Sequence, residues 1–116
     1  MHFQIFRTLN NKCESEWKKL EKQSYYNFFQ SYNYIKEIID NNKKKNIYII
    51  IIYNKNEAIA LFPLEIKKYF IFETLQWIGT KKSDYCNPII SNNFYNNIDK
   101  KIFLTLWKDI LNKIGN

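Results

Sequence analysis

The sequence has few of the residues that mark specialised folds and reactive sites. Its 116 residues include two glycines, two prolines and two cysteines, while Arg7 is the only arginine and His2 the only histidine. Cys13 and Cys86 lie in no CxxC or Cys/His spacing, so we expect no zinc site and no disulfide framework, and reduced thiols. A Ser/His/Asp triad would have to use His2 beside the N-terminus, and we expect none.

Long apolar runs are also missing. No apolar stretch approaches the ~20 residues that a membrane span needs, and residues 1–7 have no signal-peptide core. We therefore expect no membrane span and a cytoplasmic protein. The chain is 46% hydrophobic and 18% aromatic, which excludes a disordered chain, and its length predicts a single domain over residues 1–116.

The net charge of +7 raises the question of an acidic partner. Lysines cluster at 43–45, 67–68, 81–82 and 100–101, at the ends of expected elements. Arginine is the residue that reads bases and binds phosphates in a bidentate way, so its near absence argues against nucleic acid. The joint excess of Lys, Asn, Ile, Tyr and Phe, all with A/T-rich codons, indicates genome composition. A noncatalytic basic module that binds nucleic acid or a protein partner stays as the alternative function.

The stretch of residues 46–79 predicts the centre of the fold. Residues 47–53 are apolar at every position, which is typical of a strand buried on both faces and covered by a layer on each side. The turn formers of residues 54–56 predict a tight hairpin to a second strand over 58–68. A polar break at Lys67 and Lys68 predicts a turn into a third strand over 70–78, completing an antiparallel meander.

Helices are expected on either side of this meander. A short strand over 2–8 precedes a helix capped by Asn11, with Glu14 returning the hydrogen bond. Ser31 predicts the cap of a second helix. The expected buried positions are Cys13, Trp17 and Leu20 in the first helix, Tyr34, Ile35, Ile38 and Ile39 in the second, and Ile98, Ile102, Phe103, Leu106, Trp107, Ile110 and Leu111 in a final helix over 94–113.

These elements predict an α/β (α+β) fold with the order β-α-α-β-β-β-(β)-α, where residues 88–90 add a short strand to a mostly antiparallel sheet covered by helices. Residues 79–87 form the one long stretch of turn chemistry, and we place the candidate substrate site there, at Asp84, Tyr85 and Asn87. The Asp84 carboxylate can hold an amine and the Tyr85 phenol can donate a hydrogen bond. The alternative is structural, with Asp84 capping its own loop and Tyr85 packing over Trp77.

Four pieces of the sequence, in order and with the expected gaps, resemble the N-terminal lobe of two-lobed GNAT-superfamily acyltransferases, the CelD-like and FemAB-like proteins. They are Phe29-Gln30-Ser31, residues 57–64 with Ala-Ile-Ala and Pro-Leu, residues 75–79, and Ser83-Asp84-Tyr85 followed by Asn87-Pro88. The resemblance covers roughly residues 15–113. It implies a GNAT-like fold that is incomplete relative to a full GNAT domain and has an open sheet edge.

The resemblance also implies acyl transfer from acetyl-CoA or another acyl-CoA to a small-molecule amine, without a metal. The family's Gly-rich pyrophosphate loop is missing, since Gly79 and Gly115 are the only glycines. We therefore expect the cofactor to be bound by a second lobe, a partner chain or a homodimer, and the isolated chain to be inactive. Tyr32 and Tyr34 replace residues typical of the family, and Asn87 stands where Asp is common, which removes a carboxylate.

Overall fold

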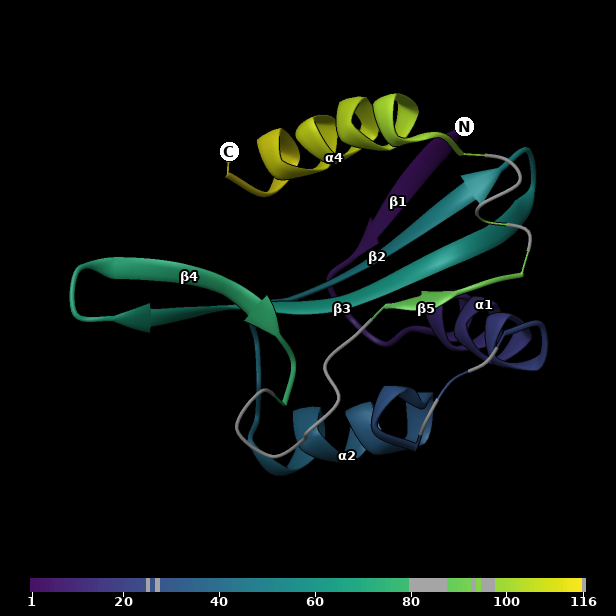
Figure 1. Ribbon diagram of the computed structural model, residues 1–116. Helices are drawn as coiled ribbons and strands as arrows, with labels where there is room; N and C mark the ends of the chain where they lie inside the picture. Colours follow the sequence, from purple (N-terminus) through teal and green to yellow (C-terminus); the bar gives the residue numbers. More distant parts are fainter. Residues whose placement is uncertain (25, 27, 80–87, 93, 95–97, 116) are drawn as a thin grey trace.

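The protein is an α+β domain built on one five-stranded sheet, seen here in a computed structural model that describes residues 1–24, 26, 28–79, 88–92, 94 and 98–115. Its elements are β1 (His2–Phe6), α1 (Asn11–Lys22), the 3-10 helix η1 (Phe28–Gln30), α2 (Tyr32–Asn41), β2 (Ile47–Asn54), β3 (Glu57–Tyr69), β4 (Phe72–Trp77), β5 (Ile89–Ile90) and α4 (Lys100–Gly115). This order and the antiparallel pairing of the strands confirm the prediction. Figure 1 shows α4 on one face of the sheet and α1 and α2 on the other.

β2 is the central strand, as its continuous apolar run predicts. It pairs with β1 on one side, where Phe3 faces Ile52, and with β3 on the other, where Ile50 faces Phe62. Ile49 and Ile51 belong to the core cluster shared with α1 and α2, whereas Ile50 and Ile52 belong to the cluster shared with α4. Burial of each isoleucine contributes about 2 kcal/mol. The sheet therefore has two cores, one on each face.

The hairpin between β3 and β4 turns later than the sequence predicts. The predicted break at Lys67 and Lys68 is wrong, because both residues stay in β3 and pair with Thr74 and Glu73 of β4. The turn is made by the apolar residues Phe70 and Ile71, and Phe70 has a φ of 60°. Lysines are compatible with strand here because this part of the hairpin projects from the body of the sheet, where both faces meet solvent (Figure 1).

One edge of β3 is shared by two strands. β4 pairs with β3 from Leu64 onward, and β5 pairs with Ala60 and Leu61. Pro63 lies between the two pairings, and its carbonyl accepts the last hydrogen bond from the β4 side, from Ile78 N at 3.0 Å. Because proline has no N–H, it suits a place where the ladder is interrupted. Among the described residues, no strand pairs with the outer side of β4.

The first helix begins one residue earlier than predicted. Asn10, and not Asn11, is the N-cap, and its side-chain oxygen accepts a hydrogen bond from Cys13 N at 2.9 Å. Asn11 is the first residue inside the helix. Two adjacent asparagines satisfy the same sequence pattern, so the choice depends on the extended backbone of Asn10, which has a ψ of 176°. The predicted buried positions of α1 are all in the core.

We expect Asn10→Ala to lower the free energy of unfolding by about 1 kcal/mol, because the Cys13 N–H loses its acceptor. Urea unfolding followed by circular dichroism measures the change. Asn11→Ala is the matched control and is expected to change stability by less than about 0.5 kcal/mol, since alanine is a good helix former. Equal losses for the two variants would contradict the assigned cap.

Ser31 caps α2 as predicted, accepting a hydrogen bond from Tyr34 N at 3.2 Å. The buried face of α2 differs by one residue from the expected set. Ile35, Ile38 and Ile39 are buried, but Tyr32 takes the place expected for Tyr34, which is half-buried. Tyr32 reaches the core because its ring packs edge-on against Trp17 of α1, with 5.4 Å between the ring centroids.

The final helix, α4, begins at Lys100 rather than at residue 94. The Asp99 side chain accepts a hydrogen bond from Ile102 N at 2.8 Å, which is an N-cap contact that sets the start of the helix. Apolar residues at 94, 98 and 102 continue the four-residue spacing across this cap, so periodicity alone could not locate it. Leu106 and Ile110 are buried as predicted, whereas Ile102 and Leu111 are 45% and 40% exposed, contrary to the prediction.

Candidate functional site

The predicted site residues Asp84, Tyr85 and Asn87 lie outside the described residues, but both ends of their segment are placed. Before it, Gly79 has a φ of +82°, and a Cβ there would lie 2.7 Å from Ile38 Cδ1 of α2. After it, the Pro88 carbonyl accepts a hydrogen bond from Gln30 Nε2 at 3.0 Å. The loop therefore leaves the sheet against α2 and returns beside η1.

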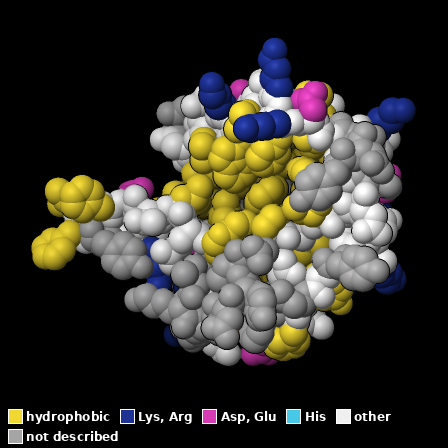
Figure 2. All heavy atoms as spheres, viewed as in Figure 1, with side chains coloured by type: hydrophobic (Ala, Val, Ile, Leu, Met, Phe, Trp, Pro, Cys, Tyr) yellow, Lys and Arg dark blue, Asp and Glu magenta, His cyan; other side chains and the backbone are white. Residues whose placement is uncertain are grey.

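An apolar pocket of about 380 Å³ lies where this loop rejoins the sheet. It is lined by Phe62, Pro88, Ile90, Phe94, Ile98, Asp99, Lys100 and Phe103. The Phe103 ring is central to it, with centroids 6.3 Å from Phe62 and 6.1 Å from Phe94. Figure 2 shows hydrophobic side chains gathered on this face, between α4 and the lower part of the molecule. Size and lining suit an apolar group of a small ligand.

The charged groups of the apolar pocket lie at the start of α4. The Asp99 carboxylate is engaged by the backbone of Ile102, and Lys100 is exposed. The described lining offers no histidine or cysteine to act as a base or nucleophile. The apolar pocket can therefore bind and orient a ligand, and its described residues do not assemble a catalytic group.

A second pocket, of about 450 Å³, is basic. It lies between the end of β1 and the C-terminal part of α2, and its charged residues are Arg7, Lys36, Lys44, Lys45 and Asp40. With Glu65, which pairs with Lys44, four cationic side chains meet two carboxylates, which leaves a formal excess of two positive charges. The sequence analysis does not identify this basic pocket, because it places the lysine cluster of residues 43–45 at the end of an element and does not connect it with Arg7.

Contacts hold most of these cations in place. Arg7 Nε donates a hydrogen bond to the Ile47 carbonyl at 2.9 Å, and its guanidinium lies 3.9 Å from the centre of the Tyr48 ring. Lys44 pairs with Glu65 at 2.9 Å. Lys36 pairs with Asp40, and the hydrogen bond raises the pKa of Lys36. The antiparallel pairing of β1 with β2 is the signal that could have located the site, since it brings the residues after β1 beside those before β2.

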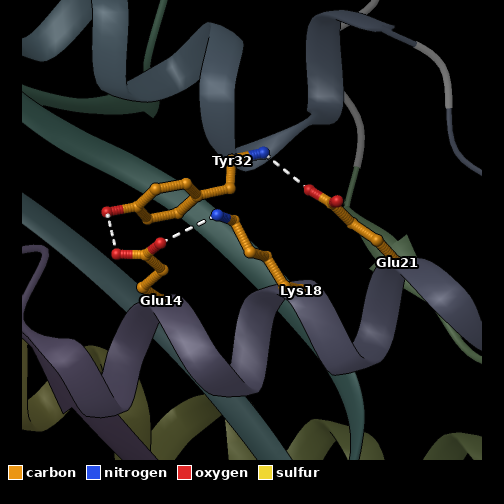
Figure 3. A network of polar contacts seen from close by, with 4 residues as sticks. All are labelled: Glu14, Lys18, Glu21 and Tyr32. Carbon is orange, nitrogen blue, oxygen red and sulfur yellow. Dashed lines mark hydrogen bonds and ion pairs between the residues drawn. The ribbon is translucent and has the colours of Figure 1, made fainter.

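A polar network joins α1 to α2 (Figure 3). Glu21 Oε1 accepts a hydrogen bond from Tyr32 N at 2.7 Å, the Tyr32 hydroxyl donates to Glu14 Oε1 at 3.3 Å, and Lys18 pairs with Glu14 Oε2 at 2.8 Å. The hydrogen bond from Lys18 lowers the pKa of Glu14, whereas burial, together with the charge of Glu14, raises the pKa of Tyr32 to about 12. The Tyr32 phenol therefore stays protonated and helps to pack α2 against α1.

Cys13 is fully buried in α1, and burial raises the pKa of its thiol to about 12. The thiolate is the nucleophilic form, so burial disfavours reaction of the Cys13 thiol at neutral pH. In the part of the chain that the structure describes, no three His, Cys, Asp or Glu residues gather where they could hold a metal ion. The helices formed by these residues include none with the length and apolar composition to cross a membrane.

Comparison of the chain with protein-family models, curated proteins and solved structures finds no match.

Proposed function

We propose that this chain is the substrate-side lobe of a GNAT-like acyltransferase and that its apolar pocket receives the apolar part of the acyl group or of the amine acceptor. The observation that carries the proposal is the position of the pocket. Pro88, which follows Asn87 in the sequence, lines it, so the loop with the predicted substrate residues Asp84, Tyr85 and Asn87 ends at the pocket wall.

Two further features support this function. The order of elements, with two helices between the first strand and an antiparallel meander, is the order that the resemblance implies. The sequence holds no glycine-rich loop for the pyrophosphate of an acyl-CoA, since Gly115 is its only glycine besides Gly79. In this proposal the cofactor belongs to a second lobe or partner chain, and the outer edge of β4 is where such a chain can add to the sheet.

The test is a titration of the ¹⁵N-labelled chain with n-hexylamine and n-hexanoate. We expect amide shifts at Ile90, Ile98 and Phe103, and Ile90→Trp, which fills the apolar pocket, should weaken binding about tenfold, equivalent to about 1.4 kcal/mol. Leu104→Trp is the matched control because Leu104 is 49% exposed on α4. Shifts that map elsewhere, or are equal in both variants, would contradict the role of the pocket.

Calorimetry with acetyl-CoA tests separately whether the cofactor is bound by this chain or by a second lobe. We expect no tight binding to the isolated chain, because its sequence has no glycine cradle for the pyrophosphate. Tight binding would overturn the assignment of the cofactor site to another lobe, and it would leave the apolar pocket to be judged by the first titration.

A second candidate function is a noncatalytic module that binds a phosphate-bearing partner through the basic pocket. The observation that favours it is the convergence of Arg7, Lys36, Lys44 and Lys45 on one cavity. Its expected signature is binding of a labelled single-stranded oligonucleotide that weakens steeply between about 50 and 200 mM salt. Lys45→Glu should reduce the affinity more than Lys113→Glu, which makes the same charge change at the end of α4. Equal effects, or no binding at low salt, would exclude this function.

A further inference from the structure

The tip of the β3–β4 hairpin, residues 70–72, presents three consecutive apolar side chains to solvent. Phe70 is 103% exposed, Ile71 87% and Phe72 68%. The hairpin projects far from the body of the sheet in Figure 1, and Figure 2 shows hydrophobic side chains at its end, separate from the rest of the molecule. Scattered exposed apolar residues are normal. A contiguous apolar group at the end of a projecting hairpin instead indicates a contact with another molecule or with a membrane.

Turn chemistry does not explain these residues. Tyr69 pairs with Phe72, so the connection is the two-residue loop Phe70-Ile71, and Phe70 adopts the left-handed conformation with a φ of 60°. Gly, Asn and Asp are the residues that favour such loops, and a bulky residue there is strained. The β2–β3 hairpin of the same chain uses Lys55, at a φ of 58°, between two asparagines. The hairpin tip is therefore apolar against its local preference.

Two lysines of β3 lie directly behind the apolar group, one on each face of the hairpin. Lys67 and Lys68 are consecutive on β3, so their side chains point to opposite faces. Lys68 is two residues before Phe70, which places it roughly 7 Å behind the tip at about 3.3 Å per residue. The Lys68 side chain is 71% exposed, and its contact with Glu73 is a loose 3.8 Å. The charge is thus arranged around the hairpin rather than along one side of it.

We propose that the hairpin tip inserts into the interface of a bilayer that contains anionic lipids, with Phe70, Ile71 and Phe72 among the upper acyl chains and Lys67 and Lys68 at the headgroups. An apolar group seated about 5–10 Å into the interface, with cations behind it, matches the depth and charge order of interfacial binding. A convex tip needs no complementary pocket in a fluid bilayer, whereas a protein groove would engage one face of the hairpin. The net charge of +7 adds attraction to an anionic surface.

Sedimentation with 100 nm vesicles of phosphatidylcholine and phosphatidylserine tests this proposal. The decisive variant is Phe70→Gly with Ile71→Asn, which places glycine at the one loop position with a positive φ and so keeps the fold. We expect at least about tenfold weaker binding from the lost apolar area, with a melting temperature that is unchanged or higher. Lys67→Ala and Lys68→Ala should each weaken binding about fivefold, and added salt or purely phosphatidylcholine vesicles should weaken it too.

Leu111→Asn is the matched control, because Leu111 is exposed on α4 and undergoes a similar loss of apolar character. Its binding should equal that of the unaltered chain. A Phe70→Trp variant gives the depth, since its fluorescence should shift to the blue and be quenched by lipids brominated near the headgroup end of the acyl chain. Folded protein that does not bind anionic vesicles at low salt, or that binds them equally when it carries the Gly-Asn loop, would overturn the proposal. So would sizing in which that loop converts a dimer to a monomer without any vesicle binding.

Discussion

Trp17→Ala is expected to lower the free energy of unfolding by about 3–5 kcal/mol. The indole is fully buried, its Nε1 donates a hydrogen bond to the Gln30 carbonyl at 3.3 Å, and it packs edge-on against Tyr32. Its removal leaves a cavity between α1, α2 and the sheet, and also removes the hydrogen bond to the Gln30 carbonyl. A domain of this size has about 5–15 kcal/mol of stability, so the variant lies near the limit of folding. Urea unfolding followed by circular dichroism measures the loss.

Trp17→Phe separates the contribution of the buried apolar volume from that of the indole hydrogen bond. The phenyl ring keeps most of the apolar volume but has no N–H to donate, so we expect a smaller loss of about 1–3 kcal/mol. Trp107 provides the control at another place, because it is only half-buried beside Phe103 on α4. Trp107→Ala should cost less than Trp17→Ala. A loss at Trp107 equal to that at Trp17 would contradict the placement of the main helical core under α1 and α2.

The fold was largely predictable because its strongest sequence signal is also its most buried element. An apolar residue at every position of 47–53 has no stable place except between two layers, and the helices on either side of this strand in the sequence supply those layers. The spacing of buried residues in α1, and the Ser31 cap of α2, followed from local chemistry. These features depend on residues that are close together in the sequence, so a sequence pattern is enough to predict them.

The errors arose where tertiary contacts select among equivalent local patterns. The turn at Phe70 and Ile71 violates turn preferences, so sequence patterns favour a break at the polar pair Lys67 and Lys68 instead. The start of α4 depends on the Asp99 cap within an unbroken apolar spacing. The basic pocket joins Arg7 to Lys44 across the β1–β2 pairing, and no window of sequence contains both. The site predicted at Asp84, Tyr85 and Asn87 stays a prediction.

The ion pair between Lys44 and Glu65 supports the second large expected effect. Lys44 Nζ lies 2.9 Å from Glu65 Oε1, and the two side chains are only 14% and 5% exposed. Lys44→Ala leaves the Glu65 carboxylate in the sheet without its partner, and removal of one member of a buried pair costs about 3–5 kcal/mol. Because Lys44 keeps some contact with water, we expect a loss near the lower value, about 3 kcal/mol, in urea unfolding.

A double variant decides whether the pair itself is stabilising or whether only its disruption is costly. Lys44→Met combined with Glu65→Leu removes both charges and keeps the volume, so we expect it to recover most of the loss, since apolar replacements of buried ion pairs are often neutral or better. The matched comparison is Lys68 with Glu73, the same residue types at 3.8 Å and 71% and 56% exposed. Its coupling in a double-mutant cycle should be below about 0.5 kcal/mol. The same double-mutant cycle, with the single and double variants, is measured for Lys44 and Glu65. If the coupling energies of the two ion pairs are equally small, the Glu65 carboxylate is exposed to water, and so is the wall of the basic pocket at Lys44.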